Sequence, residues 1–152
     1  MREIARPRLP HCSSFFVANQ RQFSDAVARR DLTRYRSRGP DQTTRLLRDA
    51  ILGAGNGKTV LDVGAGFGAL SFELLAAGAE RVTAVEAAPA YLAAAREEAR
   101  RRNVADRIDL VHGDFLSVAV TMDRREELRC LAAQPFFLQL HRLAPAGTMP
   151  AA

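Results

Sequence analysis

Three short apolar segments, separated by helix-length stretches, constrain the fold of this chain more than any other feature. Residues 59–63 (TVLDV), 81–85 (RVTAV) and 108–111 (IDLV) are typical of buried strands. Apolar residues at helical spacing predict helices over residues 69–77 and 89–102, between these strands. This repetition of strand and helix predicts right-handed crossovers and a parallel sheet with flanking helices, an α/β Rossmann-like fold.

The segments on either side are less regular. A helix is predicted over residues 24–38, and Asp41 stands at the N-cap position of another that Gly53 can end. Beyond the third strand, residues 118–122 are a candidate fourth strand and residues 124–133 a candidate helix. The predicted division of the chain is a basic N-terminal arm or lid (1–40), a nucleotide-binding domain (41–123) and an atypical C-terminal tail (124–152).

Composition excludes several classes of protein. The 152 residues are 47% hydrophobic and 26% charged, as in a globular domain, and no apolar run approaches the ~18 residues that span a bilayer. Two distant cysteines, Cys12 and Cys130, and the absence of an apolar leader predict a cytoplasmic protein. The net charge of +5 comes from the arginine-rich first third, which is typical of a solvated basic face, and nucleic acid is not the expected partner.

Two glycine-rich stretches compete as a nucleotide-binding turn. Residues 53–59 (GAGNGKT) end like a P-loop, but their first glycine is misplaced and they join a helix to a strand, the reverse of the P-loop order. Residues 62–68 (DVGAGFG) follow a strand and precede a helix, which is the correct context. Glycines in this position permit a tight turn and let a ligand lie against the backbone.

Acidic residues follow the next two predicted strands. Glu86 ends the second strand, 22 residues after Gly64, where nucleotide-binding folds place a carboxylate that accepts hydrogen bonds from ribose. Asp114 and Phe115 follow the third strand, where they could meet an amine and a base. The carboxyl ends of parallel strands share one edge, so these residues and the turn would face one elongated nucleoside ligand. Glu86 has a structural alternative, as a carboxylate at the positive end of the next helix.

Three motifs together resemble a known family. VLDVGAGFGAL, VTAVEAAPAYLAAARE and IDLVHGDFLS are similar to the first three motifs of class I S-adenosylmethionine-dependent methyltransferases, over residues 59–117. Residues 24–52 also resemble the lid and first helix of a bacterial branch often labelled magnesium-protoporphyrin O-methyltransferase-like. The resemblance implies S-adenosyl-L-methionine as cofactor. It implies these cofactor-binding residues: Asp62, Gly64, Ala65, Gly66, Gly68, Glu86, Ala87, Asp114 and Phe115.

The resemblance also implies roles for individual residues. The glycines would line the methionine part of the cofactor, and Asp62 would hold its amino group, directly or through water. Glu86 would bind the ribose hydroxyls and Asp114 the adenine amine, with Phe115 packed nearby. No catalytic residue and no metal ligand can be named from the sequence, since His112 is typical of a packed histidine at a strand end.

The predicted function is methyl transfer from S-adenosylmethionine to an unidentified small molecule. An NAD-binding oxidoreductase shares the architecture, although the turn at residues 64–69 has no basic residue for a pyrophosphate. A truncated, non-catalytic cofactor-binding fragment is the other alternative. A nucleic-acid methyltransferase is a third alternative function.

The predicted sheet has fewer strands than the methyltransferase fold. A helical crossover needs roughly a dozen residues or more, and too few separate Asp114 from residues 118–122. Two interpretations remain open: a chain truncated or frameshifted near residues 122–125, or a minimal protein that completes its sheet by self-association.

Overall fold

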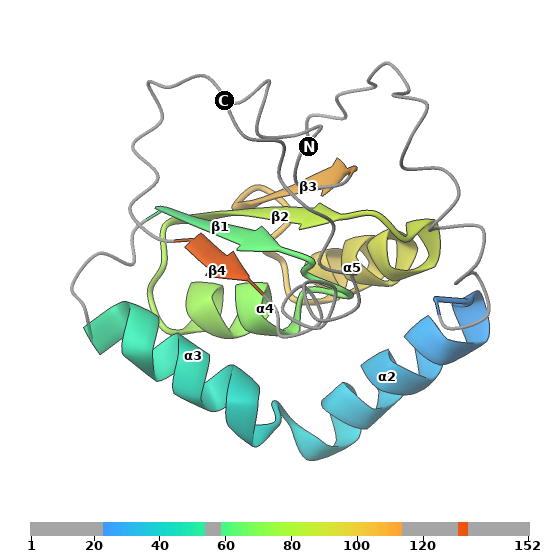
Figure 1. Ribbon diagram of the computed structural model, residues 1–152, viewed down its shortest axis with the longest axis horizontal. Coiled ribbons are helices and arrows are strands. Elements are labelled where there is room, and N and C mark those ends of the chain that lie inside the picture. Colours follow the sequence, from blue (N-terminus) through green and yellow to red (C-terminus); the bar gives the residue numbers. More distant parts are fainter. Residues whose placement is uncertain (1–22, 54–58, 114–130, 134–152) are drawn as a thin grey trace, which may run out of the picture.

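The computed structural model describes residues 23–53, 59–113 and 131–133 (Figure 1). The predicted alternation of strands and helices over residues 59–113 is confirmed. The elements are α2 (Asp25–Arg38), α3 (Gln42–Gly53), β1 (Thr59–Val63), α4 (Ala69–Ala76), β2 (Arg81–Glu86), α5 (Pro89–Arg101), β3 (Ile108–His112) and β4 (Leu131–Ala133).

The four described strands form one parallel sheet in the order β3-β2-β1-β4. The chain first builds outward from β1 to β3, and then returns to add β4 on the other side of β1. This reversal at β1 is the topological switch point at which open α/β sheets bind their ligands. The register aligns Val63 with Val85 and Glu86 with His112, so the strand ends that carry the candidate site lie side by side.

Alternation along the strands divides their side chains between two apolar clusters. Val60, Val82 and Ile108 are paired across the sheet and are fully buried in the main core. Helices α4 and α5 supply the other half of this core, with the largest buried side chains from Phe72 and Leu92. Because side chains alternate along a strand, Asp62 follows Val60 onto this face.

Helix α3 contributes Ile51 to this core, and its Leu47 and Leu52 pack against the core. Helix α2 lies beside α3 at the outer edge of the fold (Figure 1). Asp41 caps α3 as predicted, since its Oδ1 accepts a hydrogen bond from the Thr44 N–H at 2.8 Å. Helix α2 buries Ala28, Leu32 and Tyr35 in a second apolar cluster with Ala94 of α5. No helix among the described residues is long and apolar enough to cross a membrane.

One sequence prediction is wrong. The helix expected over residues 124–133 does not extend to its predicted end, because residues 131–133 form strand β4 beside β1. Leu61 pairs with Leu131, seventy residues away, and a pairing of this range depends on packing that no local pattern reveals. The strand predicted at residues 118–122 lies outside the described residues.

Candidate cofactor-binding site

The glycine turn lies at the carboxyl end of β1. Gly64, Gly66 and Gly68 have φ values of 70°, 59° and 88°, in the region that L side chains rarely adopt. The N–H groups of Gly64 and Ala65 both donate to the Val85 carbonyl, at 2.9 and 3.1 Å. The turn is therefore attached to the end of β2, and its glycines are needed for the backbone conformation itself.

Glu86 connects the glycine turn to helix α5. Its Oε2 accepts a hydrogen bond from the Gly66 N–H at 2.8 Å, and its Oε1 accepts one from the Ala88 N–H at 2.8 Å. Ala88 is the N-cap residue of α5, so the interaction with the helix end is present. Each carboxylate oxygen can accept a second hydrogen bond, so a role toward ribose hydroxyls stays a prediction.

Asp62 lies two residues before the turn and is fully buried. Its Oδ2 accepts a hydrogen bond from the Ser71 hydroxyl of α4 at 2.7 Å, while Oδ1 has no hydrogen-bond partner among the described residues. Burial raises the pKa of Asp62 to about 6, and the nearby charge of Glu86 acts in the same direction. A buried oxygen without a partner is costly, and a donor from a ligand would remove that cost.

The end of β3 lies against the end of β2. The Gly113 N–H donates to the Glu86 carbonyl at 3.1 Å, and His112 Nε2 lies 3.0 Å from the Ala87 carbonyl oxygen, which accepts its hydrogen bond. His112 is thus engaged by backbone, as expected of a histidine at a strand end. Asp114 and Phe115 lie outside the described residues, so their predicted roles are untested.

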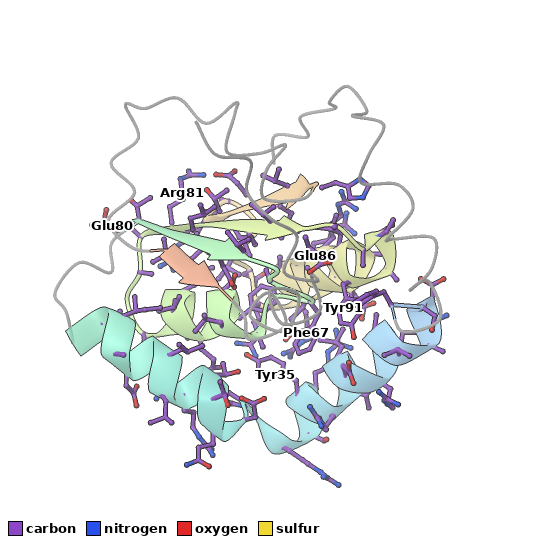
Figure 2. The ribbon with its side chains drawn as sticks, in the orientation of Figure 1. Tyr35, Phe67, Glu80, Arg81, Glu86 and Tyr91 are labelled. Atoms are coloured by element: carbon purple, nitrogen blue, oxygen red, sulfur yellow. The ribbon has the colours of Figure 1, made fainter. Side chains whose placement is uncertain are left out.

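Two tyrosines near the turn were missed by sequence reasoning. The Tyr91 ring lies close to Gly66, and its hydroxyl donates to Asp31 Oδ2 of α2 at 2.7 Å. The Tyr35 ring packs on Phe67 of the turn with ring centroids 5.3 Å apart (Figure 2). Helical spacing identifies both tyrosines as ordinary helix residues, and nothing local indicates partners about thirty to sixty positions away.

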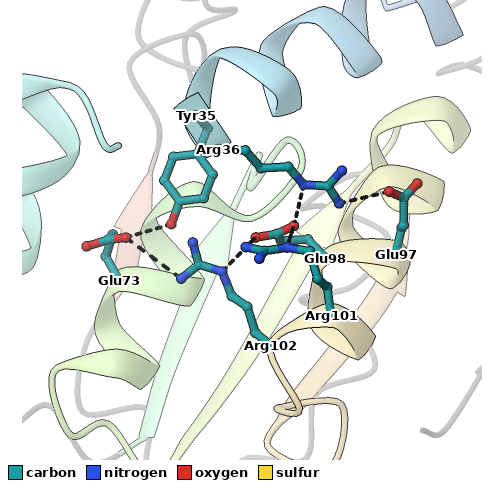
Figure 3. A network of polar contacts seen from close by, with 7 residues as sticks. All are labelled: Tyr35, Arg36, Glu73, Glu97, Glu98, Arg101 and Arg102. Atoms are coloured by element: carbon teal, nitrogen blue, oxygen red, sulfur yellow. Dashed lines mark hydrogen bonds and ion pairs between the residues drawn. The ribbon is translucent and has the colours of Figure 1, made fainter. Parts of the chain in front are cut away.

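A second polar cluster joins α2 to α4 and α5 (Figure 3). Glu98 is fully buried and accepts hydrogen bonds from three arginines, and Glu73 accepts one from the Tyr35 hydroxyl at 2.6 Å. The arginines that contact Glu98, at 2.6 to 2.8 Å, are Arg36, Arg101 and Arg102. Arg102 also lies over the Tyr35 ring, 5.0 Å from its centroid. In the part of the chain that the structure describes, no group of three or more His, Cys, Asp or Glu is placed to hold a metal ion.

The parallel sheet, the glycine turn after β1 and the acid that ends β2 define a Rossmann-like nucleotide-binding domain. A family model described as "Methyltransferase domain" matches residues 60–133. The match continues past residue 117, where the sequence resemblance was expected to end, and includes β4. The Rossmann-like methyltransferase fold is confirmed, and the matched domain indicates S-adenosylmethionine as the cofactor.

Individual relatives match the same region. The chain is 54% identical over 59 residues to "Probable ribosomal RNA small subunit methyltransferase A" of Haloarcula marismortui, covering 39% of this chain and 20% of that protein. It is 50% identical over 54 residues to ribosomal protein L11 methyltransferase of Alteromonas mediterranea, covering 36% and 18%. The matched part thus spans about a fifth of the length of these relatives.

A solved structure, the glycopeptide N-methyltransferase MtfA, is similar with a TM-score of 0.51 and 28% identity. The similarity covers 68% of this chain and 46% of that one. These proteins differ in what their names say they methylate. The label magnesium-protoporphyrin O-methyltransferase-like therefore stays a prediction.

Proposed function

We propose that this chain binds S-adenosylmethionine at the carboxyl ends of β1 and β2 and acts as a methyltransferase. The observation that supports this most is the Oδ1 of Asp62, which is buried beside the glycine turn and has no hydrogen-bond partner in the part of the chain that the structure describes. The methionine part of the cofactor carries an ammonium group, and a charged donor is the partner that a buried carboxylate oxygen lacks. The carboxylate of Asp62 is therefore a suitable acceptor for the ammonium group of this cofactor.

Glu86 is proposed to bind the ribose hydroxyls. Two backbone N–H groups, those of Gly66 and Ala88, already hold its carboxylate in place. A carboxylate oriented before the ligand arrives loses little conformational freedom on binding. Its remaining lone pairs can accept from hydroxyl groups without breaking either backbone contact.

The other predicted residues complete the proposal. Gly64, Gly66 and Gly68, together with Ala65, would leave the turn free of bulky side chains toward the methionine part, and Ala87 would lie near the ribose. Asp114 is proposed to accept from the adenine amine and Phe115 to pack against the base. These two follow Gly113, whose N–H is bonded to the end of β2.

The chemistry requires alignment more than acid–base groups. When bound, the cofactor supplies a sulfonium methyl that is already activated for displacement, so the protein contributes binding and orientation. Asp62 and Glu86 make the site acidic, which suits a cationic ligand. The turn at residues 64–69 has no basic side chain to favour the pyrophosphate of NAD.

The methyl acceptor is proposed to be a small molecule in the cytoplasm. A macromolecular acceptor is the second candidate, because the relatives include proteins named for ribosomal RNA and ribosomal protein L11. The expectation against nucleic acid is therefore not supported. Exposed arginines on α2 favour an acidic acceptor surface: Arg29, Arg30, Arg34 and Arg38.

Calorimetry with S-adenosylmethionine, S-adenosylhomocysteine and NAD tests the proposed cofactor. The first two should bind more tightly than NAD. Glu86→Ala should weaken their binding by about tenfold to over a hundredfold, because hydrogen bonds to a charged group contribute roughly 1.5–3 kcal/mol. Tighter binding of NAD by the native chain would overturn the proposal.

The Glu86 variant needs a stability control. Because Glu86 also accepts two backbone hydrogen bonds, Glu86→Ala should unfold at a lower temperature, and affinities must be compared where both proteins are folded. Glu97→Ala removes an exposed acid of α5 and should leave cofactor affinity unchanged. A folded Glu86→Ala protein with native affinity would show that Glu86 serves only the turn and the helix end.

A further inference from the structure

Helix α2 reaches the cofactor turn directly, where Tyr35 packs on Phe67, and indirectly, where its Asp31 binds Tyr91 of α5 beside Gly66. We propose that Tyr91 is a positioning residue for the turn and that Asp31 of α2 holds it, so that docking of α2 sets the affinity for the cofactor. This inference rests on the proposed function, since it concerns the same site. It assigns α2 a role in binding rather than in packing alone.

Gly66 is enclosed from two directions. On one side its N–H donates to Glu86 Oε2 at 2.8 Å. On the other side is the Tyr91 ring, because a Cβ added to Gly66 would lie 3.5 Å from Cδ1 and 3.8 Å from Cε1 of that ring. Because Gly66 has no Cβ, these distances place the ring beside the turn with space for about one methyl group between them. The ring therefore limits how far Gly66 can move away from the carboxylate of Glu86 on this side.

The Tyr91 ring is in turn held by α2. Its hydroxyl donates to Asp31 Oδ2 at 2.7 Å, and the Phe23 ring packs edge-on against it with centroids 6.3 Å apart. Burial and the hydrogen bond to Asp31 raise the pKa of Tyr91 above its usual range, so the hydroxyl stays protonated and donates. The hydroxyl end of the ring is therefore fixed by a residue of α2. Figure 2 shows Tyr91 close to Phe67 of the turn.

Loss of this hydrogen bond should loosen the ring rather than remove it. A tyrosine side chain has two rotatable torsions, and a clamped hydroxyl restricts both. Once released, the ring no longer limits the movement of Gly66 away from Glu86, and ligand binding must then order the turn. A turn that becomes ordered only when the ligand binds lowers the affinity, because ordering costs conformational entropy. A turn that is already ordered in the free protein does not have this cost.

Tyr35 offers a matched control. It also lies on the α2 interface, and its hydroxyl donates to a carboxylate, Glu73 Oε1, at 2.6 Å. Tyr35→Phe removes this hydrogen bond and keeps the ring that packs on Phe67. Tyr91→Phe and Tyr35→Phe thus each weaken the docking of α2 by one comparable hydrogen bond. Tyr91 lies beside Gly66, whereas Tyr35 meets the turn at Phe67.

The test compares binding of S-adenosylhomocysteine to the native chain and to Tyr91→Phe, Asp31→Ala and Tyr35→Phe. The melting temperature should fall by similar amounts in the two tyrosine variants. The Kd should rise about three- to tenfold in Tyr91→Phe and Asp31→Ala only, as expected for the loss of one hydrogen bond. The double variant Asp31→Ala/Tyr91→Phe should bind no more weakly than either single variant, because both remove the same contact.

Unchanged affinity in folded Tyr91→Phe and Asp31→Ala would overturn this inference and leave the proposed function intact. An equal loss in Tyr35→Phe would also overturn it, since any weakening of α2 would then suffice. If Tyr91→Phe does not fold, Asp31→Ala decides, because it leaves the ring in place. A native chain that does not bind S-adenosylhomocysteine would overturn the proposed function and this inference with it.

Discussion

Asp62 and Glu98 are both completely buried carboxylates, but they differ in their hydrogen-bond partners. Glu98 accepts hydrogen bonds from three arginines, whereas Asp62 accepts one from Ser71 and has an oxygen without a partner among the described residues. Hydrogen bonds from Arg101, and then from Arg102 and Arg36, lower the pKa of Glu98 to about 2. Burial raises that of Asp62 to about 6.

We interpret this difference as that between a charge with a structural role and a charge with the proposed role in cofactor binding. The charge of Glu98 is neutralised within the chain, by residues of α2 and α5, so its network can hold those helices together. Asp62 has no ion pair among the described residues, and a buried carboxylate of this kind is characteristic of functional sites. Burial alone does not distinguish the two residues, because both are fully buried. Their hydrogen-bond and ion-pair partners do distinguish them.

Glu98→Gln should produce the largest change in stability. The amide keeps the shape but leaves three arginines around a neutral group, so the free energy of unfolding should fall by about 2–4 kcal/mol. Urea denaturation measures this loss, and cofactor affinity should stay native where the variant is folded. Glu97→Gln, one residue earlier and exposed, should change stability little. Native stability of Glu98→Gln would remove the contrast between the two sites.

Asp62→Asn makes the same exchange of carboxylate for amide and should have the opposite effect. Its amide oxygen can still accept from Ser71, and the buried charge disappears, so the unfolding free energy at neutral pH should be unchanged or higher. Calorimetry should show weaker binding of S-adenosylmethionine by about tenfold to over a hundredfold, through the lost contact with its ammonium group. Full affinity with lower stability would identify Asp62 as a structural residue instead.

Cofactor affinity should depend on pH through Asp62. With a folded pKa of about 6, most of this carboxylate is protonated at pH 5, and the neutral acid cannot pair with an ammonium group. Affinity for S-adenosylhomocysteine should fall by about tenfold from pH 7 to pH 5. Calorimetry across this range measures the change, and Asp62→Asn should lose the pH dependence. A native profile that stays flat would contradict the assignment.

The same two carboxylates should give stability opposite pH slopes. The folded pKa of Asp62 lies above its unfolded value near 4, so its contribution makes the fold less stable as pH rises from about 4 to 6. The folded pKa of Glu98 lies below its unfolded value, so its contribution is present above about 4.5 and is lost as pH falls toward 2. The test measures the unfolding free energy of the native chain, Asp62→Asn and Glu98→Gln from pH 3 to pH 7. The difference between the native chain and each variant should change with pH in these two opposite directions.

Lys58→Ala should have the smallest effect. The segment that contains it joins α3 to β1, and a P-loop lysine requires the order strand, loop, helix. Calorimetry should therefore find native affinity for the cofactor. A large loss would place nucleotide binding at the wrong end of β1 and would undermine the contrast between Asp62 and Glu98.

Local pattern predicted the core of the fold and the positions of the glycine turn and of Glu86 at the strand ends. Apolar runs of strand length, helices of matching length between them and Asp41 as N-cap all reflect interactions within a few residues, and each was found. The glycine turn and Glu86 were also placed correctly, because parallel strands bring their carboxyl ends to one edge. The role of Glu86 as a bridge between Gly66 and Ala88 was only half expected, as a charge at the helix end.

The sequence by itself determined the alternation of elements, the turn and the acid at the end of β2, since each depends on near neighbours along the chain. Only the tertiary structure decided that residues 131–133 pair with β1, that Asp31 reaches Tyr91, and that Asp62 and Glu98 differ in their partners. These contacts join positions far apart in the chain. Their formation depends on how whole helices pack on the sheet, and the spacing of residues along the sequence carries no record of that packing.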